Sequence, residues 1–169
     1  VQTVTVIDDT PPVIAQPSEI TTNATMPSGA VVSFAPQATD NVGVVSLACA
    51  PPAGSVFPIG TTLVQCTAGD AAGNAAGAGF NVKVRGAPEQ IVDLLELARG
   101  MTLPPRLKAR LLAALQTALA NPRNKPLACA ALGAFIVLVR EQPPSAIPPA
   151  KKAQMIADAT RIKAVLGCP

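Results

Sequence analysis

The hydrophobic pattern changes its period near Gly86, and no other feature of the sequence constrains the fold as strongly. Before this point apolar residues alternate with polar ones in short runs, as in residues 80–84 (FNVKV), and clusters of Gly, Pro and Asn separate the runs. Such alternation is typical of strands. After it, apolar residues recur every three or four positions, as in residues 91–98, which is typical of helices. We therefore expect a β domain over residues 8–86 and a helical domain over residues 87–169.

The helical half contains an internal repeat. Segment 103–105 (LPP) recurs as 147–149 (IPP), and the same offset aligns residues 91–95 with residues 135–139. Proline suits the first turn of a helix, so each Pro-containing segment marks a helix start. The sequence predicts a four-helix bundle made of two pseudo-repeated helical hairpins, with helices that begin near Pro88, Pro104, Pro126 and Pro149.

The four cysteines fall as one pair in each half: Cys49 and Cys66, then Cys129 and Cys168. An even count in this arrangement predicts two disulfides and an oxidising compartment, with free thiols or a metal site as the alternatives. The spacings do not match a zinc site, because no C-x-x-C motif and no histidine is present. In an antiparallel hairpin the start of the third helix lies beside the end of the fourth, so we expect Cys129 to bond to Cys168.

The alternation in the β half also places the first two cysteines. Cys49 shares a strand face with Val45 and Leu47, and Cys66 shares one with Val64. Because one face of a half-buried strand is apolar, we expect both cysteines to face the core on strands that can be neighbours.

The composition excludes several classes of function. Aromatic residues make up 2% of the chain, with no Trp and no Tyr, so stacking on sugars or single-stranded nucleic acid is not expected. The net charge of +3 is spread thinly, which does not favour a phosphate-binding surface. With no histidine the commonest general base is missing, and we expect no enzyme activity. The longest apolar run, residues 127–139, is too short to cross a membrane.

Several motifs of the β half resemble a known family. The segments DDTPPVI (8–14), ATDNVG (38–43), FPIGTTLVQCTAGDAAGN (57–74) and FNVKV (80–84) are similar to the hyalin repeat (HYR), an immunoglobulin-like module of extracellular proteins. The resemblance implies an immunoglobulin-like β-sandwich, a disulfide between the two cysteines of this half, and a role in adhesion or spacing.

The helical half resembles a second family. The runs LGAFIVLV (132–139) and ADATRIKAVL (157–166) are similar to FIMAH, a small helical domain of bacterial surface proteins. Together the two resemblances imply a multi-domain β + α protein that is secreted or on the cell surface, of bacterial origin.

Carboxylate-bearing turns of the β half are candidate calcium ligands. They contain Asp8 and Asp9 near the start of the module, where Asp9 is the candidate ligand, Asp40 and Asn41 in one loop, and Asp70 and Asn74 in another. Calcium favours several oxygen ligands from such loops. The same side chains also form turns with their own backbone, and because no dense acidic loop is present we favour the turn-forming role. No other cofactor is indicated.

The first seven residues resemble the last strand of the module, with Val4 and Val6 on one face. Three interpretations remain open: the chain is cut from a longer array of modules, the strand folds back on its own sandwich, or it adds to the sandwich of another copy. The third predicts self-association head to tail and an extracellular filament. The alternative function is an adhesion or spacer module from a longer array that binds another protein.

Overall fold

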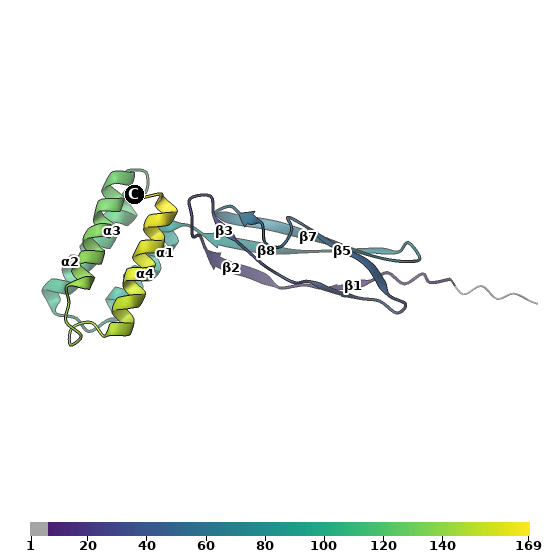
Figure 1. Ribbon diagram of the computed structural model, residues 1–169, viewed down its shortest axis with the longest axis horizontal. Helices are drawn as coiled ribbons and strands as arrows, with labels where there is room; N and C mark the ends of the chain where they lie inside the picture. Colours follow the sequence, from purple (N-terminus) through teal and green to yellow (C-terminus); the bar gives the residue numbers. More distant parts are fainter. Residues whose placement is uncertain (1–6) are drawn as a thin grey trace, which may run out of the picture. The chain divides into compact units, whose positions relative to one another are not determined.

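A computed structural model describes residues 7–169, and the contacts divide the chain into two compact units. The first unit contains residues 7–22 and 31–84, and the second contains residues 23–30 and 85–169. Strands lie between residues 13 and 85, and four helices follow them (Figure 1). The predicted order of a β domain and then a helical bundle is confirmed.

Eight strands form three small sheets in the described residues. The central sheet has the strand order β2-β8-β7-β5, and two-stranded sheets pair β1 with β4 and β3 with β6. The strands are β1 (Val13–Ala15), β2 (Glu19–Asn23), β3 (Ala30–Val31), β4 (Gln37–Thr39), β5 (Val44–Ala50), β6 (Val56–Phe57), β7 (Gly60–Asp70) and β8 (Ala75–Arg85).

The hairpin of β7 and β8 supplies most of the buried face of the first unit. The two strands pair antiparallel over their whole length, from Gly60 opposite Val84 to Gly69 opposite Ala75. Side chains alternate between core and solvent along both strands, as predicted. The buried ones are Val64, Cys66, Ala68, Phe80, Val82 and Val84.

Three phenylalanines pack together in the first unit. Phe34 packs edge-on against Phe57 and Phe80, with ring centroids 6.2 Å and 5.0 Å apart. Phe57 is fully buried and Phe80 is 3% exposed. Such edge-to-face pairs add about 0.5–1.5 kcal/mol beyond the burial of their apolar area.

Strand β5 corrects one sequence expectation. Val45 and Leu47 were predicted to face the core together with Cys49, yet Val45 is 66% exposed and Leu47 is 36% exposed. The strand lies at the edge of the central sheet, and its pairing with β7 shifts register between Val44 and Ser46. An edge strand with such an irregularity is covered less completely than its alternation implies.

Each disulfide lies within one unit. Cys49 and Cys66 are directly opposite each other on β5 and β7 and are joined by a disulfide. Cys129, near the start of α3, is bonded to Cys168, which follows the last helix. In the chain-entropy model the two bridges contribute about 3 and about 4 kcal/mol, because each closes a loop in the unfolded chain.

The second unit is a four-helix bundle in which each helix packs against two others. Helix α1 contacts α2 and α4, and α3 contacts the same two helices. The helices are α1 (Ala87–Gly100), α2 (Pro105–Ala120), α3 (Lys125–Arg140) and α4 (Pro149–Leu166). The bundle core contains Ile91, Leu94, Leu95, Leu111, Leu115, Leu132, Phe135, Val139, Met155 and Ile162.

The two hairpins of the bundle share structural details at corresponding positions. Leu103 and Ile147, which precede α2 and α4, are both buried. Lys108 Nζ donates to the carbonyl of Met101 after α1, and Lys152 Nζ donates to carbonyls at the end of α3. A cation at a helix C-terminus stabilises the unpaired carbonyls there. Both lysines therefore stabilise the C-terminus of the preceding helix, and this shared role supports the pseudo-repeat.

Gln90 is a buried polar residue in the first turn of α1. It is 2% exposed, and its Nε2 donates to the carbonyls of Ala24 and Arg85, both at 3.0 Å. Its Oε1 accepts from Nε of Arg161 at 2.8 Å. The guanidinium of Arg161 also pairs with Asp158. One side chain thus joins α1, α4 and the segment around Ala24.

Replacing Gln90 by Ala is predicted to destabilise the second unit by about 1–3 kcal/mol, because buried hydrogen-bonding groups lose their partner. Urea unfolding followed by helical circular dichroism measures the change. Gln154→Ala on the exposed face of α4 is the matched control and is expected to have almost no effect. Equal unfolding midpoints for the two variants would contradict the role of Gln90.

Candidate metal centre

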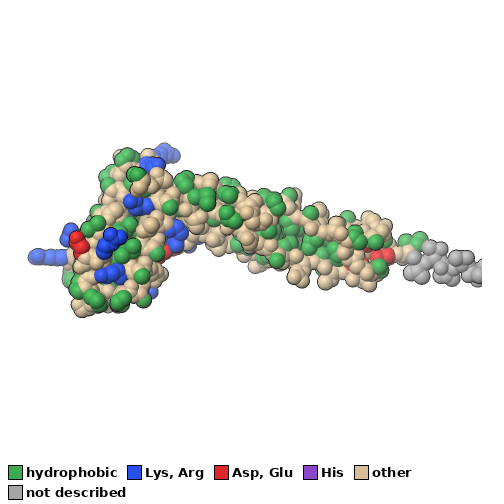
Figure 2. Space-filling model, viewed as in Figure 1, with side chains coloured by type: hydrophobic (Ala, Val, Ile, Leu, Met, Phe, Trp, Pro, Cys, Tyr) green, Lys and Arg blue, Asp and Glu red, His purple; other side chains and the backbone are tan. Residues whose placement is uncertain are grey.

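Three acidic loops meet at one end of the first unit. They are the segment before β1, the loop from β4 to β5, and the turn from β7 to β8, which lie at the same end of the strands (Figure 1). Acidic side chains gather there on the molecular surface (Figure 2). The fold therefore brings together residues that are far apart in the sequence.

Three carboxylates form the centre of this cluster. Asp8, Asp40 and Asp70 each place one oxygen within 4.8 Å of the other two. Asp70 is 6% exposed, and Asp8 and Asp40 are partly buried. Asp40 and Asp70 are among the candidates from the sequence. Asp9, the third such carboxylate, is exposed and lies outside the cluster, and Asp8 occupies the place beside the other two.

The carboxylates of Asp8 and Asp40 also form the turns that the sequence indicates. One oxygen of Asp40 accepts from the backbone N–H groups of Val42 and Gly43 at 2.9 and 3.0 Å. Asp8 Oδ1 accepts from the N–H of Thr10 at 3.2 Å, two residues later. This Asp-x-Thr turn is the signal that distinguishes Asp8 from its neighbour, since an Asp side chain favours the N–H two residues on.

Two oxygens of the cluster have no hydrogen-bond partner. Asp8 Oδ2 and Asp40 Oδ1 are fully enclosed, and no donor reaches either of them. In each residue the other oxygen of the same carboxylate is the one that the turn uses. A buried, unpaired carboxylate oxygen is costly. Turn formation therefore does not explain why these two oxygens are buried without a hydrogen-bond donor.

Asn74 connects the cluster by donating hydrogen bonds. Its Nδ2 donates to Oδ2 of Asp70 at 2.8 Å and to the carbonyl of Asp8 at 3.1 Å, and its backbone N–H donates to Oδ1 of Asp70 at 2.8 Å. Asn41 Nδ2 donates to Asp8 Oδ1 at 3.2 Å. Both asparagines were candidate ligands from the sequence. In the structure their amide nitrogens position the carboxylates.

The environment of Asp70 lowers its pKa. Burial acts to raise the pKa of this carboxyl, but hydrogen bonds from the side chain of Asn74 and from the backbone N–H groups of Asn74, Gly73 and Ala72 outweigh burial. The pKa of Asp70 therefore lies below its ordinary value. The carboxylate stays ionised at neutral pH and available to a cation.

The remaining candidates from the sequence are the cysteines and two valines. The four cysteines are all bonded in the two disulfides. Val4 and Val6 lie outside the described residues. No helix in the described part of the chain is long and apolar enough to span a membrane.

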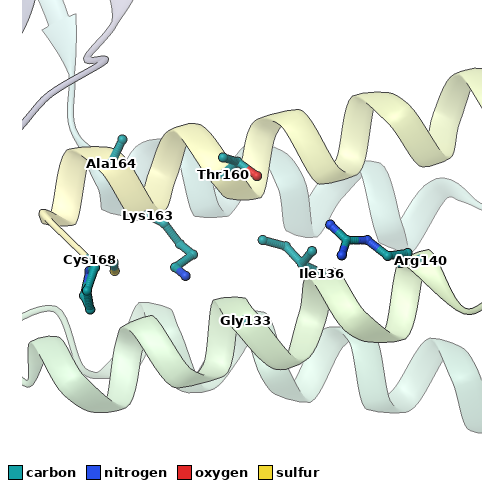
Figure 3. A pocket seen from close by; sticks show the side chains of 8 residues that line it. Gly133, Ile136, Arg140, Thr160, Lys163, Ala164 and Cys168 are labelled. Carbon is teal, nitrogen blue, oxygen red and sulfur yellow. The ribbon is translucent and has the colours of Figure 1, made fainter.

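A groove also lies in the helical unit. The groove has a volume of about 390 Å³ and runs between α3 and α4, where Ile136 and the basic side chains of Arg140 and Lys163 line it (Figure 3). Arg140 and Thr160 are exposed and Lys163 is partly exposed. The mixture of one apolar and two solvated basic side chains does not define a ligand.

Comparison with known proteins identifies the first unit. Residues 7–84 match the family model described as the HYR domain. Hyalin of Lytechinus variegatus is 42% identical over an alignment of 82 residues that covers 46% of this chain and 16% of hyalin. No solved structure matches the chain.

These matches confirm the HYR resemblance of the β half and indicate an extracellular module of the adhesion type. All three carboxylates of the cluster lie inside the matched residues. The chain covers only about a sixth of hyalin. The FIMAH resemblance of the helical half stays a prediction.

Replacing Asn74 by Ala is predicted to destabilise the first unit most at neutral pH. Because the folded-state pKa of Asp70 is lowered, its ionised form stabilises the fold above its unfolded pKa, near 3.8, and that stabilisation is lost as the pH falls through the folded-state pKa. The variant loses the side-chain hydrogen bond to Asp70. The difference in stability between the variant and the parent chain should therefore shrink as the pH falls below 3.8 and Asp70 becomes protonated. Hydrogen exchange of β7 and β8 amides in a chelating buffer measures it.

Asn81→Ala is the matched control for this experiment, because Asn81 is an exposed asparagine of the same hairpin. It should change amide exchange little at any pH. If Asn74→Ala and Asn81→Ala gave the same exchange rates from neutral to acidic pH, Asn74 would not hold the cluster together.

Proposed function

We propose that this chain is an extracellular adhesion or spacer segment whose first unit contacts another protein. The observation that carries the proposal is the HYR match over residues 7–84, which includes every described residue of the first unit. The disulfide between Cys49 and Cys66 supports an oxidising, extracellular location. The resemblance of the helical half to a bacterial surface domain supports a place on a bacterial cell surface.

A non-catalytic role fits the available side chains. The chain has no histidine, so a Ser or Cys nucleophile has no imidazole base beside it. All cysteines are bonded in disulfides. In the carboxylate cluster Asp70 is held ionised by hydrogen bonds, which suits charge binding better than proton transfer.

The edge of the central sheet is the surface that we assign to protein contact. Strand β5 ends the sheet order, and its Val45 and Leu47 side chains are exposed. Large apolar side chains on an edge strand favour pairing with another protein, because the strand also carries unpaired backbone groups. This contact mode adds main-chain hydrogen bonds to apolar burial.

Beads that carry the full chain are predicted to bind saturably to cells of the organism that encodes it. Changing Val45 and Leu47 together to Asp should lower binding at least about fivefold, because burying an unpaired charge costs more than ~1 kcal/mol. The matched control changes two exposed β7 residues, Thr61 and Thr67, to Asp. Equal binding by both double variants, or none by the parent chain, would reject the proposed contact.

A head-to-tail filament is the second candidate function. The exposed edge of β5 supports it, since a strand from another copy pairs best with a sheet edge. In the sequence Val4 and Val6 alternate with threonines, so a strand formed by this segment would have one apolar face. A contact of this kind builds an open polymer unless its rotation closes a ring.

Sedimentation of the full chain at high concentration tests the filament. Polymers that dissociate when Val4 and Val6 are changed to Asp are the result expected for strand addition, because the charges cannot be buried against the sandwich. A monomer at all concentrations, or polymers that persist in the variant, would exclude it.

A further inference from the structure

We infer that Asp8, Asp40 and Asp70 bind one calcium ion, which fixes the chain segment that enters the module. The inference does not depend on the adhesive function, because ion binding is measured on the isolated chain. It assigns the main role at the start of the module to Asp8, whereas the sequence analysis chose its neighbour Asp9 as the candidate ligand.

The distances fit one ion among the three carboxylates. Calcium binds oxygen ligands at about 2.3–2.6 Å, so two oxygens on the same ion lie at most about 5 Å apart. One carboxylate oxygen from each of Asp8, Asp40 and Asp70 lies within 4.8 Å of the other two. An ion placed among them is therefore within reach of all three without a change in the backbone.

The enclosed oxygens of two of these carboxylates give a second reason. Asp8 Oδ2 and Asp40 Oδ1 are shielded from solvent and have no donor. Hydrogen bonds satisfy the turn-forming oxygens of the same carboxylates, so the turns do not need these two atoms. A cation between the carboxylates satisfies both oxygens and removes the repulsion between three neighbouring negative charges.

The chemistry of the ligands selects calcium among common metals. All candidate donors are oxygens, and the chain offers no histidine and no free thiol, so zinc and copper are disfavoured. Magnesium demands a tight octahedron at about 2.0–2.1 Å, whereas calcium accepts six to eight oxygens in flexible geometry. Three loops from separate parts of the chain suit the flexible coordination of calcium better than the strict octahedron of magnesium.

The position of Asp8 gives the ion a structural role. Asp8 precedes β1, whereas Asp40 follows β4 and Asp70 ends β7. The carbonyl of Asp8 is already held by Asn74 of the β7–β8 turn. An ion shared by the three loops would add a stronger link at the same point and so restrict the direction in which the preceding chain enters the module.

Calorimetric titration of the chelator-treated full chain with calcium chloride tests the site. We expect one ion per chain with a dissociation constant of about 10⁻⁴–10⁻³ M, typical of extracellular modules. Asp8→Asn should weaken binding at least about tenfold through the loss of one charged ligand. Asp9→Asn, at the exposed neighbouring position, is the matched control and should bind like the parent chain.

Thermal unfolding of the first unit gives a readout that a purely structural role of Asp8 would not change in the same way. In chelator, Asp8→Asn should be as stable as the parent chain or more stable, because one of three repelling charges is removed. In saturating calcium the order should reverse, because only the parent chain gains the full binding energy. Hydrogen exchange of residues 7–12 should slow with calcium in the parent chain only.

Three results would overturn the inference. The first is the absence of saturable calcium binding, and the second is equal binding by Asp8→Asn and Asp9→Asn. The third is an equal response to magnesium chloride, which would reject calcium as the ion. If the beads bind cells but calcium does not bind, the adhesive function survives without the metal. The converse result leaves the metal site without that function.

Discussion

The antiparallel pairing of β7 with β8 is the interaction on which the first unit depends. Its register places Val64 opposite Phe80 and Cys66 opposite Ala78, so one face of both strands is buried. A slip of one residue would turn that face to solvent. The same hairpin holds β5 through the disulfide from Cys66, and its turn presents Asp70 to the acidic cluster. Core, covalent bridge and candidate site all depend on one register.

The acidic cluster shows how turn chemistry and ion binding use the same residues. One oxygen of Asp8 and one of Asp40 accept backbone N–H groups and shape their loops. This orients the second oxygen of each carboxylate inward, away from solvent and from donors. A loop built by a carboxylate is therefore also a preorganised ligand, because the hydrogen bonds already hold the side chain in place. Asn74 performs the same positioning for Asp70.

The helical unit depends on an apolar core that contains a buried polar side chain. Its core is apolar, and the pseudo-repeated hairpins use corresponding leucine or isoleucine anchors, Leu103 and Ile147, before α2 and α4. The exception is Gln90, whose amide donates hydrogen bonds to two backbone carbonyls and accepts one from the guanidinium of Arg161. A buried amide with all its partners present adds specificity to an apolar core, whose packing alone tolerates alternatives.

The sequence by itself determined the features that depend on local periodicity and turn preference. These are the β and helical halves, the helix starts at proline, the buried alternation of β7 and β8, and the loops that contain Asp40 and Asp70. Only the tertiary structure decided which residues meet from distant segments. Asp8 enters the cluster because its turn faces Asn74, 66 residues away, and Gln90 reaches Arg161 across 71 residues. Val45 is exposed because β5 became an edge strand. A local pattern shows which face of a helix or strand is apolar. Which residues from distant segments contact each other depends on how the helices and strands pack.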